Sequence, residues 1–351
     1  MPEQTLRLGI IGTGTIAAVH ATAAQLLPQV RLVAATSRRE QSGREFCNRF
    51  SCDFESSVES LVARSDIDAV AITTPSGAHA ECGILAAQAG KHVFCEKPID
   101  VTLEKIDLLI ETCRAHGVQL GAVFQSRMGE GAIAFKNAVE AGRFGTISQC
   151  SAYIPWYRTD EYYQSVGWRG TRALDGGGAL MNQGVHAIDL LLWLAGDVEE
   201  VSARCDTRLH KTIEVEDNAV AWLRFKSGAL GVIQASTCSW PGQKKRLEIM
   251  GAEGTVIMED DAFKTWSFRE AAPEDAERLA PKNASGIGGG ASDPKAISNE
   301  GHRRLYEDFA DAVFTGRPPR ISGEEARRSV NLILAIYRSN ESGKPVRVAD
   351  M

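Results

Sequence analysis

The first residues whose types and spacing could do chemistry form a glycine-rich turn near the start of the chain. Gly12-Thr13-Gly14-Thr15-Ile16-Ala17, a GxGxxA pattern, follows a short apolar run and opens a helical stretch. The first glycine permits a tight turn, the second lets a pyrophosphate approach the backbone, and the small last residue allows close helix–strand packing. Phosphates would then face the positive end of the helix. We expect Gly12, Thr13, Gly14, Thr15 and Ile16 to bind a dinucleotide; the alternative is a structural glycine turn in another α/β domain.

A second group that could bind a cofactor lies at the end of the next apolar run. In NAD-binding domains a carboxylate there usually accepts a hydrogen bond from the ribose 2′-hydroxyl. This chain has Ala35-Thr36-Ser37-Arg38-Arg39 instead, with no acid. Ser37 and Arg38 suit a 2′-phosphate, since a guanidinium binds phosphate through two hydrogen bonds. We therefore expect NADP(H) to be preferred, with NAD(H) possible; the alternative is that Arg38 and Arg39 are only the solvated start of the following helix.

The elements that must position these residues alternate between strand and helix over the first third of the chain. Near-continuous apolar strands separated by helices indicate a parallel sheet covered on both faces. The expected strands are residues 6–11, 32–35, 67–73, 91–95 and 118–124, and the expected helices are 15–27, 39–50, 78–89 and 103–116. This pattern predicts an α/β Rossmann domain that binds NAD(P) over residues 1–125.

After residue 125 the alternation stops and strands predominate. The expected helices are 130–141, 179–194, 303–314 and 324–338, and the expected strands are 147–153, 201–209, 218–225, 229–237, 247–250 and 255–259. An aromatic loop at 153–168 and a polar, glycine-rich loop at 271–300 are expected to shape a substrate pocket. Hairpin-like turns between the strands favour an antiparallel sheet. We predict an α+β domain over residues 126–351, with a large, mainly antiparallel sheet, for substrate binding and oligomerisation.

Composition and charge narrow the class of protein. The chain has 351 residues, of which 44% are hydrophobic and 24% charged, as in a two-domain globular protein. A net charge of −6 argues against nucleic-acid binding. The sequence shows neither a signal peptide nor an apolar run near the roughly 20 residues of a membrane helix, so we expect a cytoplasmic protein. The eight cysteines form no CxxC pair and favour buried thiols, so no metal site is predicted.

Three motifs in sequence order carry a resemblance to a known family. They are Gly12 to Ala17, Lys91-His92-Val93-Phe94-Cys95-Glu96-Lys97-Pro98, and Gly176-Gly177-Gly178-Ala179-Leu180-Met181-Asn182-Gln183-Gly184-Val185-His186. Together they resemble the Gfo/Idh/MocA oxidoreductases, the family of glucose–fructose oxidoreductase and inositol 2-dehydrogenase, over nearly the whole chain. Trp168-Arg169-Gly170-Thr171 and the stretch from Gly177 to Asp189 are more weakly similar to the UDP-N-acetylglucosaminuronate 3-dehydrogenase branch.

The resemblance implies a catalytic pair. Lys97 matches the lysine beside the nicotinamide, whose ammonium can bind the reacting oxygen, and Pro98 is cis in relatives. His186 matches the proton acceptor, a role open to an imidazole with an ordinary pKa of about 6.5. Asn182 stands where inositol-dehydrogenase-like members carry Asp, so we expect it to position its neighbours without supplying charge. From the residues alone, Lys97 would be a solvated strand-end charge and His186 a satisfied helix histidine.

The same resemblance places further residues along the cofactor. Thr74, Pro75 and His79 are expected along its pyrophosphate and nicotinamide edge, Glu96 and Gln125 near the ribose, and Trp168 and Arg169 from the second domain. A place in the core is the alternative for Trp168. Gly176 to Gly178 are expected to let the backbone approach the nicotinamide or substrate, Asp189 to be structural, and His302 to approach the pocket.

The predicted function is hydride transfer between a nicotinamide and a secondary alcohol or ketone of a sugar, sugar nucleotide or cyclic polyol, with Lys97 and His186 as the catalytic pair. Two alternatives stay open: a redox-neutral enzyme that retains its nicotinamide cofactor, and a non-catalytic NADP(H)-binding regulator. The expected partners are a small carbohydrate or polyol substrate and further copies of the chain, as a homodimer or homotetramer. No nucleic acid and no membrane are expected.

Overall fold

The computed structural model describes residues 4–279 and 298–351, which divide by their contacts into two compact units. Unit 1 extends to Gln125 and also includes Ser298–Arg327, whereas unit 2 comprises Ser126–Ile297 and Arg328–Met351. The boundary after Gln125 coincides with the end of the domain expected over residues 1–125. The return of a later segment to unit 1 differs from the expected domain of residues 126–351.

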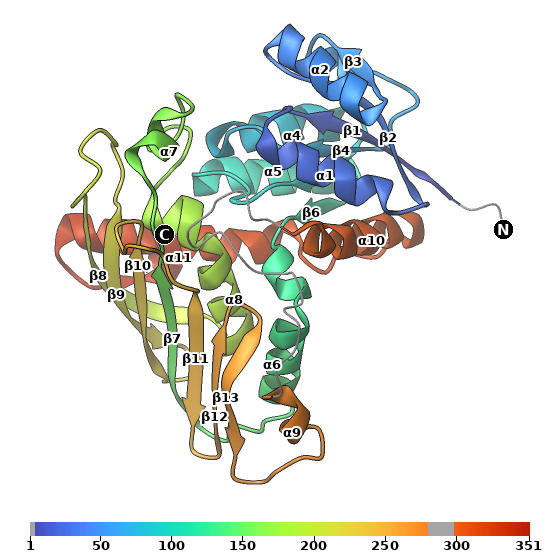
Figure 1. Ribbon diagram of the computed structural model, residues 1–351. Helices are drawn as coiled ribbons and strands as arrows, with labels where there is room; N and C mark the ends of the chain where they lie inside the picture. Colours follow the sequence, from blue (N-terminus) through green and yellow to red (C-terminus); the bar gives the residue numbers. More distant parts are fainter. Residues whose placement is uncertain (1–3, 280–297) are drawn as a thin grey trace. The chain divides into compact units, whose positions relative to one another are not determined.

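Unit 1 is built on a six-stranded sheet in which every neighbouring pair is parallel (Figure 1). The strand order is β3-β2-β1-β4-β5-β6, and the order reverses between β1 and β4, where ligands bind in open α/β sheets. The predicted α/β class and parallel sheet are confirmed. The strands are β1 (Leu6–Ile11), β2 (Val30–Thr36), β3 (Asp53–Glu55), β4 (Ala69–Ile72), β5 (His92–Cys95) and β6 (Leu120–Ala122).

Helices connect these strands and cover the sheet, which explains why the central strands are apolar along their whole length. They are α1 (Thr15–Gln25), α2 (Glu40–Phe50), α3 (Val58–Val62), α4 (His79–Gln88) and α5 (Leu103–Ala115). The sequence pattern missed β3 and α3, because elements of three and five residues show too little periodicity. The side chains of Ser57 and Ser60 cap α3 reciprocally.

Helix α10 (Asn299–Thr315) belongs to unit 1 although it lies far along the sequence. It packs on α1, and its Phe309 ring lies 4.9 Å from the Phe94 ring of β5. Beyond it, Ser322 forms a β-bridge with Gly121 of β6. The expected second domain is therefore corrected here: an amphipathic helix joins the surface that buries its apolar face, and its periodicity does not reveal which surface that is.

Unit 2 contains an eight-stranded sheet in the order β13-β12-β11-β7-β10-β9-β8-β14. Neighbouring strands are antiparallel except for β7 and β10, so the predicted mainly antiparallel sheet is confirmed. Burial alternates along β9, as expected when one face is covered. The strands are β7 (Ile147–Pro155), β8 (Val198–Asp206), β9 (Asn218–Phe225), β10 (Leu230–Ser236), β11 (Arg246–Gly251), β12 (Gly254–Glu259), β13 (Ala262–Phe268) and β14 (Val346–Arg347).

Helices of unit 2 cover one face of that sheet. Helix α8 (Val185–Ala195) packs on β7 and β11, and α6 (Glu130–Glu140) packs on α8 (Figure 1). The expected aromatic loop contains a short helix, α7 (Asp160–Gln164), and the beginning of the expected 271–300 loop contains α9 (Asp275–Arg278). Residues 280–297 of that loop, including Gly286 and Gly288 to Gly290, lie outside the described residues.

A last long helix, α11 (Gly323–Ser342), crosses the division between the units. Within residues 4–279 and 298–351, no helix has the length and apolar character that a membrane span requires.

Candidate functional site

The glycine-rich turn between β1 and α1 has the geometry that a pyrophosphate needs. Gly12 has a φ of +96°, and a Cβ there would lie 2.9 Å from the Thr73 carbonyl oxygen, so this position requires glycine. A Cβ on Gly14 would meet nothing within 4 Å. Gly14 is also the N-cap of α1 and has no side chain that could cap the helix. Because the start of a helix favours anions, this end of α1 suits the phosphate oxygens of a dinucleotide.

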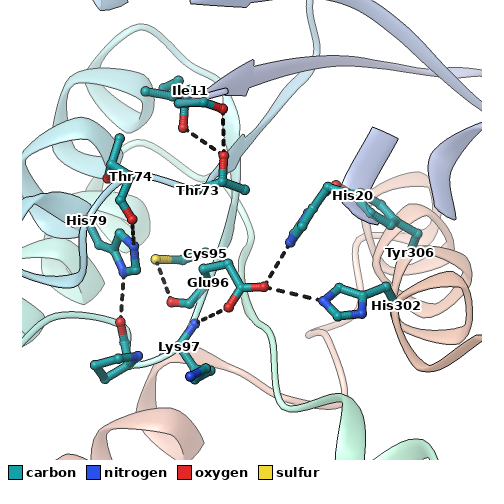
Figure 2. A network of polar contacts seen from close by, with 12 residues as sticks. Ile11, His20, Thr73, Thr74, His79, Cys95, Glu96, Lys97, His302 and Tyr306 are labelled. Atoms are coloured by element: carbon teal, nitrogen blue, oxygen red, sulfur yellow. Dashed lines mark hydrogen bonds and ion pairs between the residues drawn. The ribbon is translucent and has the colours of Figure 1, made fainter. Parts of the chain in front are cut away.

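Two neighbouring strands hold this turn. The Thr73 hydroxyl donates to the Gly12 carbonyl oxygen at 2.8 Å, and the Gly12 N–H donates to Thr36 at the end of β2 at 2.9 Å. Figure 2 shows Thr73 reaching back to Ile11 as well, at 3.1 Å. Thr13 and Ile16 are half-buried at the turn and Thr15 is exposed.

Ser37 and Arg38 come directly after β2, half-buried and exposed respectively. The nearest acid along the chain is Glu40, whose carboxylate forms an ion pair with Arg44 at 2.8 Å. The carboxyl end of β2 is thus followed by the Ser37 hydroxyl and the Arg38 guanidinium. The next acid along the chain, Glu40, is paired with Arg44.

His79 links the turns that follow β4 and β5. Its two ring nitrogens lie 2.7 Å from the Pro98 carbonyl oxygen and 2.9 Å from the Thr74 carbonyl oxygen (Figure 2). The ring is 1% exposed. His79 therefore holds the turn containing Thr74 and Pro75 against the turn containing Lys97, which gives it a structural part in the site whether or not it touches a cofactor.

Glu96 and Lys97 form the turn after β5. The Glu96 side chain is buried, and its Oε2 accepts the Lys97 backbone N–H at 3.0 Å. Lys97 is half-buried, and the Lys97–Pro98 peptide bond is cis, as expected. Burial alone would raise the pKa of Glu96, but hydrogen bonds from His20 and His302 outweigh it and hold that pKa well below its usual range.

Two polar atoms near this turn have no hydrogen-bond partner among the described residues. They are Gln125 Oε1, beyond the end of β6, and His302 Nδ1, in the first turn of α10. The two side chains come from neighbouring positions, since a Cβ on Gly301 would lie 2.8 Å from Gln125 Cβ. Buried orphan groups are uncommon in proteins. A polyhydroxylated ligand, such as the ribose of a dinucleotide, could bond to these two atoms. The open space over Gly14 is likewise consistent with a bound dinucleotide.

His186 is the second residue of α8 and is half-buried. The expected helix over 179–194 is corrected: residues Ala179–Gly184 form a π-helix, and the α-helix begins at Val185. Asn182 therefore belongs to the π-helical turn and His186 to the α-helix that follows it, so the two do not lie in one regular α-helix. π-Helical turns often occur at functional sites, and periodicity in a sequence does not distinguish them from α-helix.

The glycines before this helix pack on protein groups. A Cβ on Gly178 would collide with the Glu216 carbonyl oxygen, and one on Gly177 would collide with the Tyr337 hydroxyl. The Glu216 carboxylate also accepts the N–H groups of Gly178 at 3.1 Å and Leu180 at 2.8 Å. Packing within unit 2 is therefore enough to require glycine at positions 177 and 178, and the expected approach of this backbone to nicotinamide or substrate stays a prediction.

Asn182 is hydrogen-bonded to an acid that the sequence pattern did not single out. Its side-chain amide donates to the carboxylate of Asp175, which is 1% exposed, and its oxygen accepts from Gln183 Nε2 at 2.6 Å. Gln183 accepts in turn from the Arg158 guanidinium at 2.6 Å. These hydrogen bonds orient the Asn182 amide. The Asp175 carboxylate also places a negative charge beside Asn182, whose own side chain is uncharged.

Trp168 and Arg169 are half-buried in unit 2. The Arg169 guanidinium donates to Ser165 Oγ at 2.6 Å and lies 4.1 Å from the centre of the Tyr162 ring. Their contact with a cofactor stays a prediction. Asp189 pairs with Arg127 at 2.6 Å, both fully buried, which confirms its structural role.

The predicted residues fall into two groups. Those from Gly12 to Gln125 follow the carboxyl ends of β1, β2, β4, β5 and β6, which lie along one edge of a parallel sheet. Asn182, His186, Trp168 and Arg169 belong to unit 2. Sequence reasoning missed His20, Tyr306, Asp175 and Glu216, because the sequence around a residue carries no signal of its distant hydrogen-bond partner.

Comparisons with known proteins cover both units. Residues 6–124 match the family described as "Oxidoreductase family, NAD-binding Rossmann fold", and residues 133–257 match the "GFO/IDH/MocA C-terminal domain". Myo-inositol 2-dehydrogenase of Thermotoga maritima is 28% identical over 99% of each chain. The 2,7-anhydro-N-acetylneuraminate hydratase of Mediterraneibacter gnavus is 27% identical over 99% of this chain and 98% of its own.

A solved structure gives a similar result. The WlbA dehydrogenase of Bordetella pertussis, in complex with NADH and UDP-GlcNAcA, is 32% identical and matches with a TM-score of 0.89 over 99% of this chain and 98% of its own. The similarity therefore extends over both units and the whole length of the relative.

Proposed function

The chain belongs to the GFO/IDH/MocA oxidoreductases, and from that premise we propose that it transfers a hydride between a nicotinamide and a secondary alcohol or ketone of a sugar, sugar nucleotide or cyclic polyol. One observation carries the proposal: the phosphate-binding turn and the Glu96-Lys97-Pro98 turn follow strands of one parallel sheet and lie along one edge of it. That edge is where open α/β sheets bind their ligands.

Lys97 and His186 form the proposed catalytic pair. In oxidation, His186 takes the proton of the substrate hydroxyl, and the Lys97 ammonium donates a hydrogen bond to the same oxygen. In reduction, the same two groups donate to the forming alcohol. The bound nicotinamide supplies the hydride acceptor or donor. Asn182 is a positioning residue, supported by its hydrogen bond to the buried Asp175 carboxylate.

The N-terminal unit is an NAD-binding Rossmann domain, and we propose a preference for NADP(H) within it. Support comes from the exposed Arg38 and half-buried Ser37 after β2, together with the ion pair that engages Glu40. A guanidinium favours a 2′-phosphate. The residues that would hold the dinucleotide are Gly12, Thr13, Gly14, Thr15, Ile16, Ser37, Arg38, Thr74, Pro75, His79, Glu96, Lys97, Gln125, Trp168 and Arg169.

A sugar, a sugar nucleotide or a cyclic polyol is the proposed substrate. The names of the relatives support this class, since they act on or bind an inositol, an anhydro sugar acid and UDP-GlcNAcA. A homodimer or homotetramer is proposed because the open face of the unit 2 sheet exposes Val220, Trp222 and Leu230. All eight cysteines are free, which supports a cytoplasmic location.

A redox-neutral reaction with a retained cofactor is the second candidate. It is supported by the relative named a hydratase, which is nearly as similar to this chain as the inositol dehydrogenase. The chain has both residues of the proposed catalytic pair, Lys97 and His186, which disfavours a role as a non-catalytic regulator.

A panel of sugars, polyols and sugar nucleotides, each offered with NAD⁺ and NADP⁺, tests the proposal by following the absorbance of the reduced nicotinamide. Net reduction of free dinucleotide with at least one substrate is the expected result. Substrate conversion without net reduction, by protein that copurifies with dinucleotide, would favour the redox-neutral candidate.

A further inference from the structure

A closed polar network lies behind the Lys97 turn, built from three elements of unit 1 (Figure 2). His20 of α1 contacts Glu96 Oε1 through Nε2 at 3.0 Å, and His302 of α10 contacts the same oxygen through Nε2 at 3.4 Å. The Tyr306 hydroxyl lies 2.7 Å from His20 Nδ1. The other carboxylate oxygen of Glu96 accepts the Lys97 N–H.

With Glu96 ionised, these contacts indicate where the protons lie. A carboxylate accepts only, so both histidines must carry a proton on Nε2. The Tyr306 hydroxyl can then donate to His20 Nδ1, which leaves His20 neutral. A continuous chain of donors runs from Tyr306 through His20 to Glu96.

The surroundings of the network support this assignment. His20, His302 and Tyr306 are fully buried. The Phe94 ring packs against His20 and Tyr306, and the Phe309 ring stacks on Phe94. Burial lowers the pKa of His20 and raises that of Tyr306 well above its usual range, which favours a neutral imidazole and a neutral phenol. In so apolar a site, an ionised carboxylate depends on every hydrogen bond it receives.

We propose that His20, His302 and Tyr306 are positioning residues for Lys97, which act by holding the Glu96 carboxylate that accepts the Lys97 backbone N–H. The inference rests on the proposed role of Lys97. It also explains why α10 belongs to unit 1. This helix brings His302 to Glu96, 206 positions earlier in the chain, and Tyr306 to His20, 286 positions earlier.

Binding of a metal ion is the alternative use of these atoms, since one ligand atom from each of His20, Glu96 and His302 lies within 4.8 Å of the others. A metal would need the Nε2 lone pairs that the hydrogen-bond assignment protonates. The hydrogen-bonded network therefore requires a proton on Nε2 of both histidines, whereas a bound metal requires Nε2 without a proton.

Two measurements on the full chain test the proposal without turnover. In ¹⁵N spectra of histidine-labelled protein, His20 is expected as the neutral Nε2–H tautomer. Hydrogen exchange of the Lys97 amide is expected to accelerate about tenfold or more in His302→Leu, and much less in His302→Gln, which keeps an N–H donor. The Gly12 amide, bonded to Thr36 in the same sheet, is expected to keep its exchange rate and so reports on global opening.

Turnover supplies the third readout. His302→Leu and Tyr306→Phe are expected to lower kcat about tenfold and about threefold, with the KM for dinucleotide changed less than about twofold, and His302→Gln is expected to recover most of kcat. The matched control is His92→Gln: His92 Nδ1 accepts the Gln119 N–H at 2.9 Å in the same sheet but does not touch the network. It is expected to keep the wild-type kcat.

Three results would overturn the proposal. They are an Nδ1–H tautomer for His20, a tightly bound metal ion whose removal changes the histidine signals, and Lys97 exchange in His302→Leu equal to that in His92→Gln. A wild-type protein with no turnover on any sugar or polyol would count against the proposed function instead, and the tautomer and exchange results would still decide whether the network holds the Lys97 turn.

Discussion

Asn182 donates its side-chain amide to the carboxylate of Asp175, seven residues earlier in the chain. Asp175 is buried and also accepts the Gly170 backbone N–H at 2.7 Å, so its position is fixed from two sides. Asn182 lies in the π-helical turn before the helix that carries His186, and Asp175 supplies a carboxylate beside its uncharged amide.

Exchanging these two residues tests the coupling. Asp175→Asn removes the charge and is expected to lower kcat about tenfold to a hundredfold, the range of a charge-assisted hydrogen bond. The double variant Asp175→Asn/Asn182→Asp rebuilds a carboxylate–amide pair and is expected to recover most of the loss. Steady-state kinetics on all three proteins measure this. A double variant no better than Asp175→Asn would refute the coupling.

The two glycines of the phosphate turn are expected to respond differently to alanine. Gly12→Ala forces a side chain into left-handed backbone beside the Thr73 carbonyl, so it is expected to lose about 1–3 kcal/mol of folding stability. Gly14→Ala meets no neighbouring atom and is expected to keep its melting temperature while losing dinucleotide affinity. Thermal unfolding and dinucleotide titration separate the two effects. Unchanged dinucleotide binding in Gly14→Ala would argue that the phosphates lie elsewhere.

Cofactor preference is expected to depend on the residues after β2. Arg38→Ala removes a 2′-phosphate partner and is expected to lower kcat/KM with NADP(H) about tenfold or more, with little effect on NAD(H). Ser37→Asp, which introduces the missing carboxylate, is expected to shift preference further toward NAD(H). Equal kcat/KM values for both dinucleotides in the wild-type protein would contradict the proposed preference.

Stability at low pH is expected to depend on Glu96. Its folded-state pKa lies well below the ordinary 4.5, so Glu96 stabilises the fold above that pH, and the contribution is lost as pH falls below it. The lowered pKa of His20 has the same sign and acts from about its ordinary 6.5 downward. Glu96→Gln removes the first contribution.

Denaturant unfolding of wild-type and Glu96→Gln protein at several pH values measures this dependence. The stability difference between the two proteins is expected to shrink as the pH falls below 4.5. A difference that stays constant with pH would mean that Glu96 has the same pKa in the folded and unfolded chain.

Much of the fold could be predicted because its signals are local. The GxGxxA turn, the apolar strands and the glycines that stop helices at Gly90 and Gly117 all act within a few residues. The return of α10 to unit 1 could not be predicted, because its apolar face fits more than one surface. Nor could the π-helical turn before His186, since it depends on the distant Glu216 and Tyr337.

The candidate site shows the same division. Gly12 and Gly14 are set by backbone chemistry that a sequence displays, whereas the support of Glu96 comes from side chains 76 and 206 positions away. Such long-range hydrogen bonds produce no periodic pattern in the sequence. From the sequence alone, His20 would therefore be interpreted as an ordinary core histidine.

The central claim is that Lys97 and His186 act on the substrate, and single-turnover hydride transfer in Lys97→Ala and His186→Ala tests it most directly. Each variant is expected to slow transfer about a hundredfold to ten-thousandfold, or roughly 3–5 kcal/mol, while dinucleotide affinity changes only a few-fold. Near-wild-type transfer rates in either variant, with the cofactor bound, would contradict the account.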